Sequence, residues 1–348
     1  MKAAVLYAND DIRFTDYETP KVEPGTVKVR VRATGICGSD VPRVLYNGAH
    51  YYPIVLGHEF SGDVVEVGEG VTSVNVGDTV SGAPLIPCMK CEDCQNGDFS
   101  LCKHYSFIGS RRQGSFAEYV VMPEVNAVRY DSSIPYEQAA MFEPSTVALH
   151  GLLCNDYRGG RCVAVLGCGT IGIFTQQWAQ IFGAKRVVVF DIDDGRLALA
   201  KRMGADAVIN TKTTDYLAEC SRLTDGKGFD FVFEAAGNPA TIHIAYEIAA
   251  NKAKICCIGT PHVGISFTPQ EWETMNRKEF GLTGSWMSYS APFPGREWKL
   301  TAHYFATGQL KFDPDFIFRK YPMEKVADAF ACFHHPEQVH GKILLINE

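Results

Sequence analysis

The chain has 348 residues and a formal net charge of −7, with 46% apolar and 21% charged residues. At about 150 residues per domain, this length predicts two domains, each large enough for its own core. No apolar run approaches the ~20 residues that span a bilayer, and no basic run offers a surface to nucleic acid or to an anionic membrane. An anionic substrate would therefore need a local basic pocket.

The first 150 residues have the pattern of a mostly antiparallel β domain. Residues 27–33 alternate apolar and polar side chains, as in a half-buried strand. Residues 62–67, 79–81 and 116–121 are similar, and turn signals separate these segments. We therefore predict a barrel-like antiparallel domain over residues 1–150.

Four cysteines within this domain have the spacing C-x2-C-x2-C-x7-C: Cys88, Cys91, Cys94 and Cys102. Such spacing predicts a closed, tetrahedral structural zinc site in a lobe over residues 88–102. The alternative, disulfides, is typical of small secreted domains. The segment Met1–Asp10 has no long apolar stretch, so a signal peptide is not expected. Reduced cysteines and no targeting segment predict a cytoplasmic protein.

From residue 160 the pattern changes to alternating strands and helices, with candidate strands at residues 162–166, 186–190, 207–209, 231–234 and 254–258. Such alternation predicts a doubly wound parallel sheet with right-handed crossovers over residues 151–287. A Pro/Gly-rich stretch at 291–295 follows, then expected helices at 297–306 and 323–333 and a strand at 342–346. We expect residues 288–348 to return and complete the first domain.

A glycine fingerprint follows the first of these strands, in the order Gly167-Cys168-Gly169-Thr170-Ile171-Gly172, and an apolar helix follows it. In this context Gly167 permits a tight turn, Gly169 lets the backbone approach a pyrophosphate, and Gly172 permits close helix–strand packing. The phosphates would lie at the helix N-terminus, beside Thr170 and Ile171. The segment therefore predicts a dinucleotide site.

Asp191 ends the next strand, nineteen residues after Gly172. A carboxylate there accepts hydrogen bonds from the ribose hydroxyls and repels a 2′-phosphate, which favours NAD over NADP. The alternative role of Asp191 is a helix cap. Arg196 lies nearby and can in principle admit NADP, pack on the adenine or remain solvated.

A second metal candidate combines Cys37, His58 and Glu59. A catalytic zinc needs soft and borderline ligands and one open position. A lone Cys or His is more often a core residue, but a further carboxylate, Glu143, precedes Pro144 near the expected domain junction. There it can face both the metal and the nicotinamide.

These motifs together resemble zinc-containing medium-chain dehydrogenases/reductases of the polyol, sorbitol dehydrogenase-like branch. The resemblance covers essentially the whole chain and rests on Gly35–Asp40, Gly57–Gly62, Val76–Val80, the four-cysteine lobe, Gly114–Tyr119, Glu143-Pro144 and the glycine fingerprint. It implies a GroES-like catalytic domain, a Rossmann domain, NAD, and two zinc ions per chain. Cys37, His58 and Glu143 would ligate the catalytic zinc directly or through water, with Glu59 an exchanging or orienting group. A homodimer or homotetramer is the default assembly.

The expected reaction is the reversible oxidation of a secondary alcohol to a ketone, with Ser39 taking the hydroxyl proton; its alternative role is a turn hydroxyl. Relatives continue the proton relay with a histidine five residues after the zinc cysteine, but this chain has Pro42 there. His50 is one possible substitute, and the cofactor ribose, or water and Glu59, are others.

Stretches such as Asn47–Ile54 and Phe107–Arg112 resemble sugar-phosphate dehydrogenases of this branch. The expected substrate is a polyol phosphate, with galactitol 1-phosphate giving tagatose 6-phosphate. Arg111 and Arg112 are the candidate phosphate clamp, because guanidinium pairs phosphate bidentately; surface solvation is the alternative. Tyr51 and Tyr289 can hydrogen-bond polyol hydroxyls or simply pack, and Arg43 and Arg296 are weaker candidates for the phosphate. Sorbitol, arabitol phosphate or ribitol phosphate, or a catalytically silent NAD-binding protein, are the other interpretations.

Overall fold

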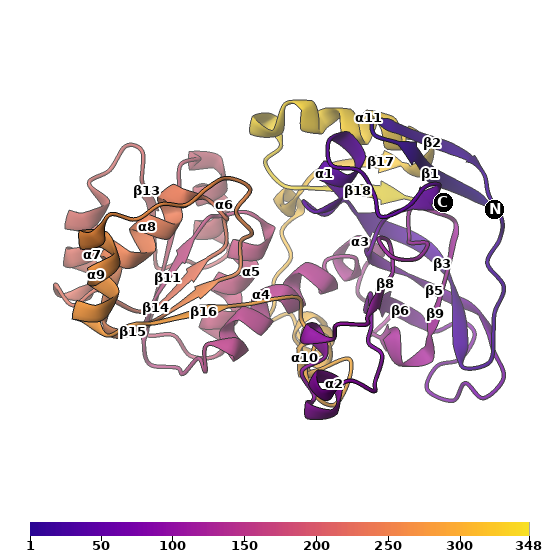
Figure 1. The fold of residues 1–348 in the computed structure, drawn as a ribbon, viewed down its shortest axis with the longest axis horizontal. Coiled ribbons are helices and arrows are strands. Elements are labelled where there is room, and N and C mark those ends of the chain that lie inside the picture. The colour runs from indigo at the N-terminus through magenta and orange to yellow at the C-terminus, as the bar shows by residue number, and fades with distance from the viewer. Residues whose placement is uncertain (348) are drawn as a thin grey trace. The chain divides into compact units, whose positions relative to one another are not determined.

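The computed structural model describes residues 1–347 and divides the chain into two compact units (Figure 1). The first unit combines Met1–Thr146 with the segment from Ser288 to the carboxyl-terminal end, and the second unit is Val147–Met287. The first unit is therefore built from both ends of the chain. No helix among residues 1–347 is long and apolar enough to cross a membrane.

A seven-stranded, largely antiparallel sheet forms the centre of the first unit. Its strand order is β10-β6-β5-β3-β18-β17, and β9 also pairs with β3. The bounds are β3 (Thr26–Gly35), β5 (Glu59–Val67), β6 (Thr79–Gly82), β9 (Tyr119–Pro123), β10 (Ala127–Arg129), β17 (Ile317–Pro322) and β18 (Lys342–Ile346). The alternation predicted for residues 27–33 is visible in β3, where Val27, Val29 and Val31 are fully buried among the core side chains.

Shorter elements complete this unit. A three-stranded sheet joins β2 (Asp11–Asp16), β1 (Lys2–Ala8) and β4 (Ile54–Val55), and a two-stranded sheet joins β7 (Leu85–Ile86) and β8 (Ser106–Phe107). The helices are α1 (Asp40–Leu45), α2 (Glu92–Asn96), α3 (Tyr136–Ala139), α10 (Arg296–Ala306) and α11 (Val326–Ala331), with six short 3-10 helices at 99–101, 124–126, 314–316, 323–325, 332–334 and 336–338. Helix α4 (Phe142–Cys154) leads into the second unit.

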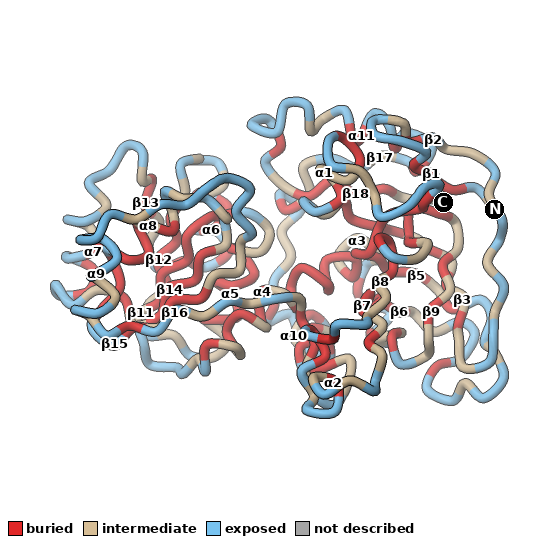
Figure 2. Tube along the Cα trace, viewed as in Figure 1, coloured by how far each residue is buried: buried red, intermediate tan, exposed pale blue. Residues whose placement is uncertain are grey.

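The second unit is a six-stranded, all-parallel sheet in the order β13-β12-β11-β14-β15-β16. Its strands are β11 (Cys162–Leu166), β12 (Arg186–Asp191), β13 (Ala207–Asn210), β14 (Phe229–Glu234), β15 (Ala249–Cys257) and β16 (Gly281–Gly284). Its helices are α5 (Thr170–Ile181), α6 (Asp194–Arg202), α7 (Tyr216–Thr224), α8 (Pro239–Ile248) and α9 (Pro269–Lys278). The central strands are buried along their length, as Figure 2 shows, because helices cover both faces of such a sheet.

The predicted fold class, a doubly wound parallel sheet plus a mostly antiparallel β domain, is confirmed. Several details differ from the sequence prediction. The helix expected at 323–333 is a short α-helix, α11, between two 3-10 turns. The strands that were not predicted are β1, β2, β4, β7, β8, β10, β17 and the edge strand β16. Strand β16 contains two glycines in four residues, and its residues are mostly exposed. A short, glycine-rich edge strand carries little periodic signal.

Candidate zinc and nucleotide sites

The four cysteines of the lobe converge in three dimensions. Their sulfur atoms all lie within 4.8 Å of one another. The Sγ atoms of Cys88 and Cys94 are 3.9 Å apart, and those of Cys91 and Cys102 are 3.8 Å apart. Zn–S bonds of ~2.3 Å in a tetrahedron place sulfur atoms roughly 3.8 Å apart. The donor set and its spacing therefore fit a zinc ion with four thiolate ligands.

Backbone N–H groups within the lobe stabilise the thiolate form of one of the four cysteines. The N–H groups of Lys90 and Cys91 point at the Cys88 sulfur and lower its pKa to about 6. Burial has the opposite effect on Cys94, whose pKa rises to about 12. A cation at the centre of the cluster offsets that burial, because a metal ion favours the thiolate form of its ligands.

A second group of potential ligands gathers where β3 ends and β5 begins. One ligand atom from each of Cys37, His58 and Glu59 lies within 4.8 Å of the other two. The antiparallel pairing produces this, since Gly35 of β3 pairs directly with Glu59 of β5. A Cβ at Gly35 would come within 2.3 Å of the Glu59 carboxylate, so glycine makes room for that side chain.

Asp40 lies beside the His58 ring. Its Oδ1 is 3.5 Å from His58 Nδ1, both side chains are buried, and neither atom has a hydrogen-bond partner among residues 1–347. The ring packs edge-on against Phe107, with centroids 5.5 Å apart. With Nδ1 facing a carboxylate, Nε2 is the nitrogen left for a metal, which is the usual arrangement at histidine-ligated metal sites.

Lys342 holds the Glu59 carboxylate, a contact that the sequence analysis missed. Its Nζ lies 2.7 Å from Oε1 and 2.6 Å from Oε2, with both side chains at least 90% buried. Burial alone would lower the pKa of Lys342, but the negative charges of Glu59, Cys37 and Glu143 outweigh it and raise that pKa. The available signal was a lysine opening an otherwise apolar strand, β18.

Glu143 lies in the first turn of α4 and is buried, but it is not one of the three residues whose ligand atoms share the 4.8 Å cluster. Burial raises its pKa to about 7, while His58 lowers it and Glu59 raises it. Burial and the Glu59 charge also raise the pKa of Cys37. This buried set is rich in acidic groups, so its chemistry fits a bound cation.

Ser39 and Arg43 lie next to Cys37. The Ser39 hydroxyl is 3.4 Å from the Cys37 sulfur. Arg43 Nη1, on α1, donates to the Ser39 hydroxyl at 2.9 Å and to its carbonyl oxygen at 2.7 Å. Pro42 occupies the middle of α1. His50 is exposed, and partial burial of its ring together with Arg111 and Arg43 lowers its pKa.

Three of the four residues predicted to contact substrate line one cavity of about 250 Å³: Tyr51, Arg111 and Arg112. Arg111 also stacks on Tyr105, with its guanidinium carbon 4.4 Å from the ring centroid. Tyr289 lies elsewhere, buried, and its hydroxyl accepts the Leu85 N–H at 3.0 Å.

The glycine fingerprint lies where β11 meets α5. Gly167 has a φ of +94°, and a Cβ there would come within 2.8 Å of Ala236. A Cβ at Gly172 would come within 1.9 Å of the Gly167 carbonyl oxygen, whereas one at Gly169 would meet no atom of residues 1–347 within 4 Å. The open space at Gly169 and the start of α5 at Thr170 fit a dinucleotide pyrophosphate.

The Asp191 carboxylate, at the end of β12, forms hydrogen bonds with the fingerprint turn and with the residues that follow β12. Its Oδ2 accepts the Cys168 N–H at 2.6 Å, and its Oδ1 accepts the N–H groups of Ile192 and Asp193. Asp193, and not Asp191, caps α6 by accepting the N–H of Arg196. The helix-cap alternative for Asp191 is therefore wrong.

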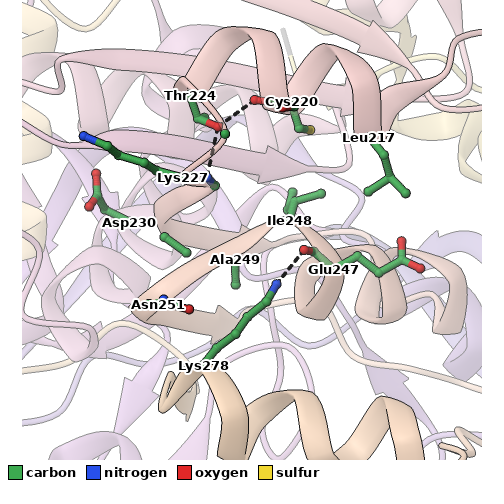
Figure 3. A pocket seen from close by; sticks show the side chains of 14 residues that line it. Leu217, Cys220, Thr224, Lys227, Asp230, Glu247, Ile248, Ala249, Asn251 and Lys278 are labelled. Atoms are coloured by element: carbon green, nitrogen blue, oxygen red, sulfur yellow. Dashed lines mark hydrogen bonds between the residues drawn. The ribbon is translucent and has the colours of Figure 1, made fainter.

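A larger cavity of about 630 Å³ lies elsewhere in the second unit (Figure 3). Its wall includes Asp230 near the start of β14, Ala249 at the start of β15, and Lys278, which donates to the Glu247 carbonyl oxygen at 2.7 Å. In a parallel sheet these strand starts lie at the opposite edge from the glycine fingerprint, which follows a strand end. This cavity is therefore separate from the nucleotide site.

Two known families match the chain. Residues 23–132 match the alcohol dehydrogenase GroES-like domain, and residues 170–302 match the zinc-binding dehydrogenase family. Galactitol 1-phosphate 5-dehydrogenase of Escherichia coli K12 is 38% identical over 347 residues, covering 99% of this chain and all of the relative. Sorbitol dehydrogenase of Bacillus subtilis is 33% identical, covering 75% of each chain.

Solved structures agree with this assignment. The crystal structure of galactitol-1-phosphate dehydrogenase from Escherichia coli superposes with a TM-score of 0.94 at 38% identity, over the whole of both chains. A putative zinc-binding dehydrogenase from Sinorhizobium meliloti, bound to NADP, gives a TM-score of 0.88 at 28% identity, over 99% of each chain. With its two candidate zinc clusters and its glycine fingerprint, the chain belongs to the zinc-binding, medium-chain alcohol and polyol dehydrogenases.

Proposed function

We propose that this dehydrogenase oxidises a secondary alcohol of a polyol phosphate with NAD, and that galactitol 1-phosphate, giving tagatose 6-phosphate, is its substrate. The carrying observation is the 38% identity with galactitol 1-phosphate 5-dehydrogenase along the full length of both chains. Cys37, His58 and Glu59 support the chemistry, because they gather in one buried cluster of metal-ligand type.

Cys37 and His58 hold the catalytic zinc, with Glu59 and Glu143 as the carboxylates available to it. When bound, Zn²⁺ supplies Lewis-acid polarisation of an alcohol oxygen. The Asp40 carboxylate lies 3.5 Å from His58 Nδ1. Lys342 competes for Glu59, so this carboxylate can exchange between an ammonium and a metal. Cys88, Cys91, Cys94 and Cys102 hold the structural zinc.

Ser39 accepts the proton of the substrate hydroxyl. Arg43 donates to the Ser39 oxygen, so the serine hydroxyl hydrogen points away from that guanidinium. Pro42 cannot carry the proton further, and the Arg43 guanidinium has no acceptor atom that could take it. His50, whose pKa is lowered by partial burial and by the charges of Arg111 and Arg43, is the candidate for the next step.

Gly167, Gly169, Gly172, Thr170 and Ile171 form the pyrophosphate cradle of the bound NAD. Asp191 favours NAD, since a carboxylate at the end of β12 repels a 2′-phosphate. Arg196 lies in the first turn of α6, where it would pack beside the adenosine half of the cofactor. Bound there, NAD would supply the acceptor for the carbinol hydride.

Arg111 and Arg112 are the phosphate-clamp candidates, and Tyr51 shares their cavity. Tyr289 contributes through packing, because its hydroxyl already accepts the Leu85 N–H. We also propose a homodimer or homotetramer in the cytoplasm, which light scattering and cell fractionation test directly.

The test measures NAD reduction by the zinc-loaded protein with galactitol 1-phosphate, galactitol and sorbitol, each repeated with NADP. Cys37→Ser is the control, because it removes a zinc ligand and abolishes the activity. We expect a strong preference for the phosphate ester and for NAD. Equal or better turnover of a free polyol would contradict the proposed substrate and leave a sorbitol-type dehydrogenase.

A further inference from the structure

Glu234 is the last residue of β14, and its side chain is fully buried in the second unit. Its Oε1 accepts the N–H groups of Ala236 and Gly237, both at 2.9 Å, and its Oε2 accepts the Gly237 N–H at 3.1 Å. The Thr241 hydroxyl, on α8, lies 2.7 Å from Oε1. The carboxyl group therefore holds the loop that joins β14 to α8.

The backbone of Glu234 holds a second loop. Its carbonyl oxygen accepts the N–H groups of Ile258 at 2.8 Å and Gly259 at 3.0 Å, in the segment that follows β15. The two loops touch backbone to backbone, since a Cβ at Gly259 would come within 2.2 Å of the Gly237 nitrogen. Gly237 itself has a φ of +64°, and a Cβ there would come within 2.6 Å of the Thr260 carbonyl oxygen. One residue therefore fixes the loops after β14 and β15 in a single arrangement.

The loop after β14 borders the glycine fingerprint. Ala235 donates its N–H to the Leu166 carbonyl oxygen at 2.8 Å, and Leu166 pairs with Glu234 across the parallel strands β11 and β14. A Cβ at Gly167 would come within 2.8 Å of the Ala236 side chain. Ala236 is exposed, so the outer face of this loop is accessible to a ligand while the carboxyl group behind it is buried.

These loops lie at the point where the strand order reverses. Strands β12 and β13 are on one side of β11, and β14, β15 and β16 are on the other. A dinucleotide binds across such a switch point, at the carboxyl ends of the strands and with its pyrophosphate at the fingerprint. Asp191 ends β12, on the adenosine side, so the nicotinamide half of the cofactor belongs over the ends of β14 and β15.

We infer that Glu234 is a positioning residue for the cofactor, whose carboxyl group arranges the backbone of residues 235–238 and 258–260 for the nicotinamide half of NAD. Without this acceptor, the N–H groups of Ala236 and Gly237 pair with water in other loop arrangements. A cofactor that needs one arrangement then binds more weakly, in proportion to the fraction of the protein that has it. The inference concerns the cofactor and does not depend on which alcohol the enzyme oxidises.

The experiment measures the dissociation constants of NAD and of AMP by titration calorimetry on the whole chain, loaded with zinc. AMP has only the adenosine half of the cofactor, so its binding reports the Asp191 side of the site alone. Glu234→Met should weaken NAD binding about 10- to 100-fold, as expected for the loss of two hydrogen bonds. It should change AMP binding less than about twofold, because AMP does not reach the ends of β14 and β15.

Two milder variants test the same contacts. Glu234→Gln keeps one acceptor oxygen for the two N–H groups and should recover part of the NAD affinity that Glu234→Met loses. Thr241→Val removes only the hydroxyl and should weaken NAD binding about 3- to 10-fold, the range for one hydrogen bond. Both replacements nearly preserve the side-chain volume, so they test the inference even where Glu234→Met fails to fold.

Asp230→Asn is the matched control, because Asp230 lies on the same strand, near its other end (Figure 3). Its Oδ2 accepts the Cys162 N–H at 2.9 Å, so this carboxylate also holds a backbone group. It lines the 630 Å³ cavity and not the nucleotide site. The dissociation constants of NAD and AMP for Asp230→Asn should equal those of the unchanged protein, whatever the change in Tm.

The two ligands separate a local role from a general one. Weaker NAD binding with unchanged AMP binding in the Glu234 and Thr241 variants supports the inference. Equal weakening of NAD and AMP overturns it, because the second unit as a whole is then disturbed. Unchanged NAD binding in both Glu234→Gln and Thr241→Val overturns it as well. A protein that binds NAD as expected but prefers a free polyol contradicts only the proposed substrate.

Discussion

Replacing Lys342 with Met removes the ammonium group that holds the Glu59 carboxylate inside the first unit. The two groups are 2.6 to 2.7 Å apart, and Lys342 also donates to the Ile36 carbonyl oxygen at 3.3 Å. Methionine has a similar length and fills the same space. The substitution therefore leaves a buried carboxylate without its cation and creates little cavity.

The cost can be worked out for the metal-free protein. Removing one partner of a buried ion pair costs about 3–5 kcal/mol, since the remaining charge is uncompensated. For a unit of about 200 residues, that range corresponds to a fall in Tm of roughly 7–12 °C. Bound zinc reduces the loss, because a cation beside Glu59 replaces the missing ammonium charge.

The direction in which folding shifts the pKa of Lys342 decides the pH of the assay. The pKa of Lys342 is raised in the folded state, so the pair contributes its full stability below the unfolded pKa of ~10.4 and loses it as pH rises through the folded pKa. Neutral pH lies well inside the stable range.

The assay is thermal or urea unfolding of chelated protein for Lys342→Met, Glu59→Gln and the double variant. Chelation removes zinc from both sites in every sample, so the variants are compared in the same metal-free state. The double variant should be more stable than Lys342→Met alone by about 2 kcal/mol or more, because it no longer has the unpaired carboxylate charge at position 59. A loss below about 1 kcal/mol in Lys342→Met, or no recovery in the double variant, would refute the reasoning.

Three further predictions concern the other sites. Cys91→Ser should lower bound zinc from two ions to one per chain in metal analysis while the cluster of Cys37 keeps its ion; retention of both ions would contradict the four-thiolate site. Gly169→Ala should keep its Tm, because its Cβ meets open space, but should weaken NAD binding in a fluorescence titration, because that space is where the pyrophosphate would lie. Gly172→Ala should also lower the Tm, since its Cβ would come within 1.9 Å of the Gly167 carbonyl oxygen. Equal Tm values for the two variants would contradict this prediction. If His50 carries the proton onward, His50→Gln should remove an inflection of the pH–rate profile below pH ~6.5, because its pKa is lowered from that value; an unchanged profile would assign the proton to another route.

Local spacing was enough to predict most of the fold and the four-cysteine zinc set, whereas the ligand roles of Cys37, His58 and Glu143 came from the family resemblance. The fingerprint of Gly167, Gly169 and Gly172 and the spacing of the four lobe cysteines are short-range features, because each motif lies within one turn or one lobe. Period-2 alternation in β3 and the strand–helix alternation after residue 160 predicted the two sheets for the same reason, since side-chain periodicity reports which face is buried. The edge strand β16 and the split helix around α11 carry too weak a pattern for this.

The tertiary structure alone decided which charges meet. Lys342 and Glu59 are 283 residues apart, and β18 brings them together by pairing with β3, whose Gly35 also pairs with Glu59. Arg111 stacks on Tyr105 and lines one cavity with Arg112 and with Tyr51, which comes from a distant part of the chain. Spacing along the chain identifies groups that one element holds, whereas ion pairs and subsites depend on strand register and loop packing between distant segments, which no local pattern records.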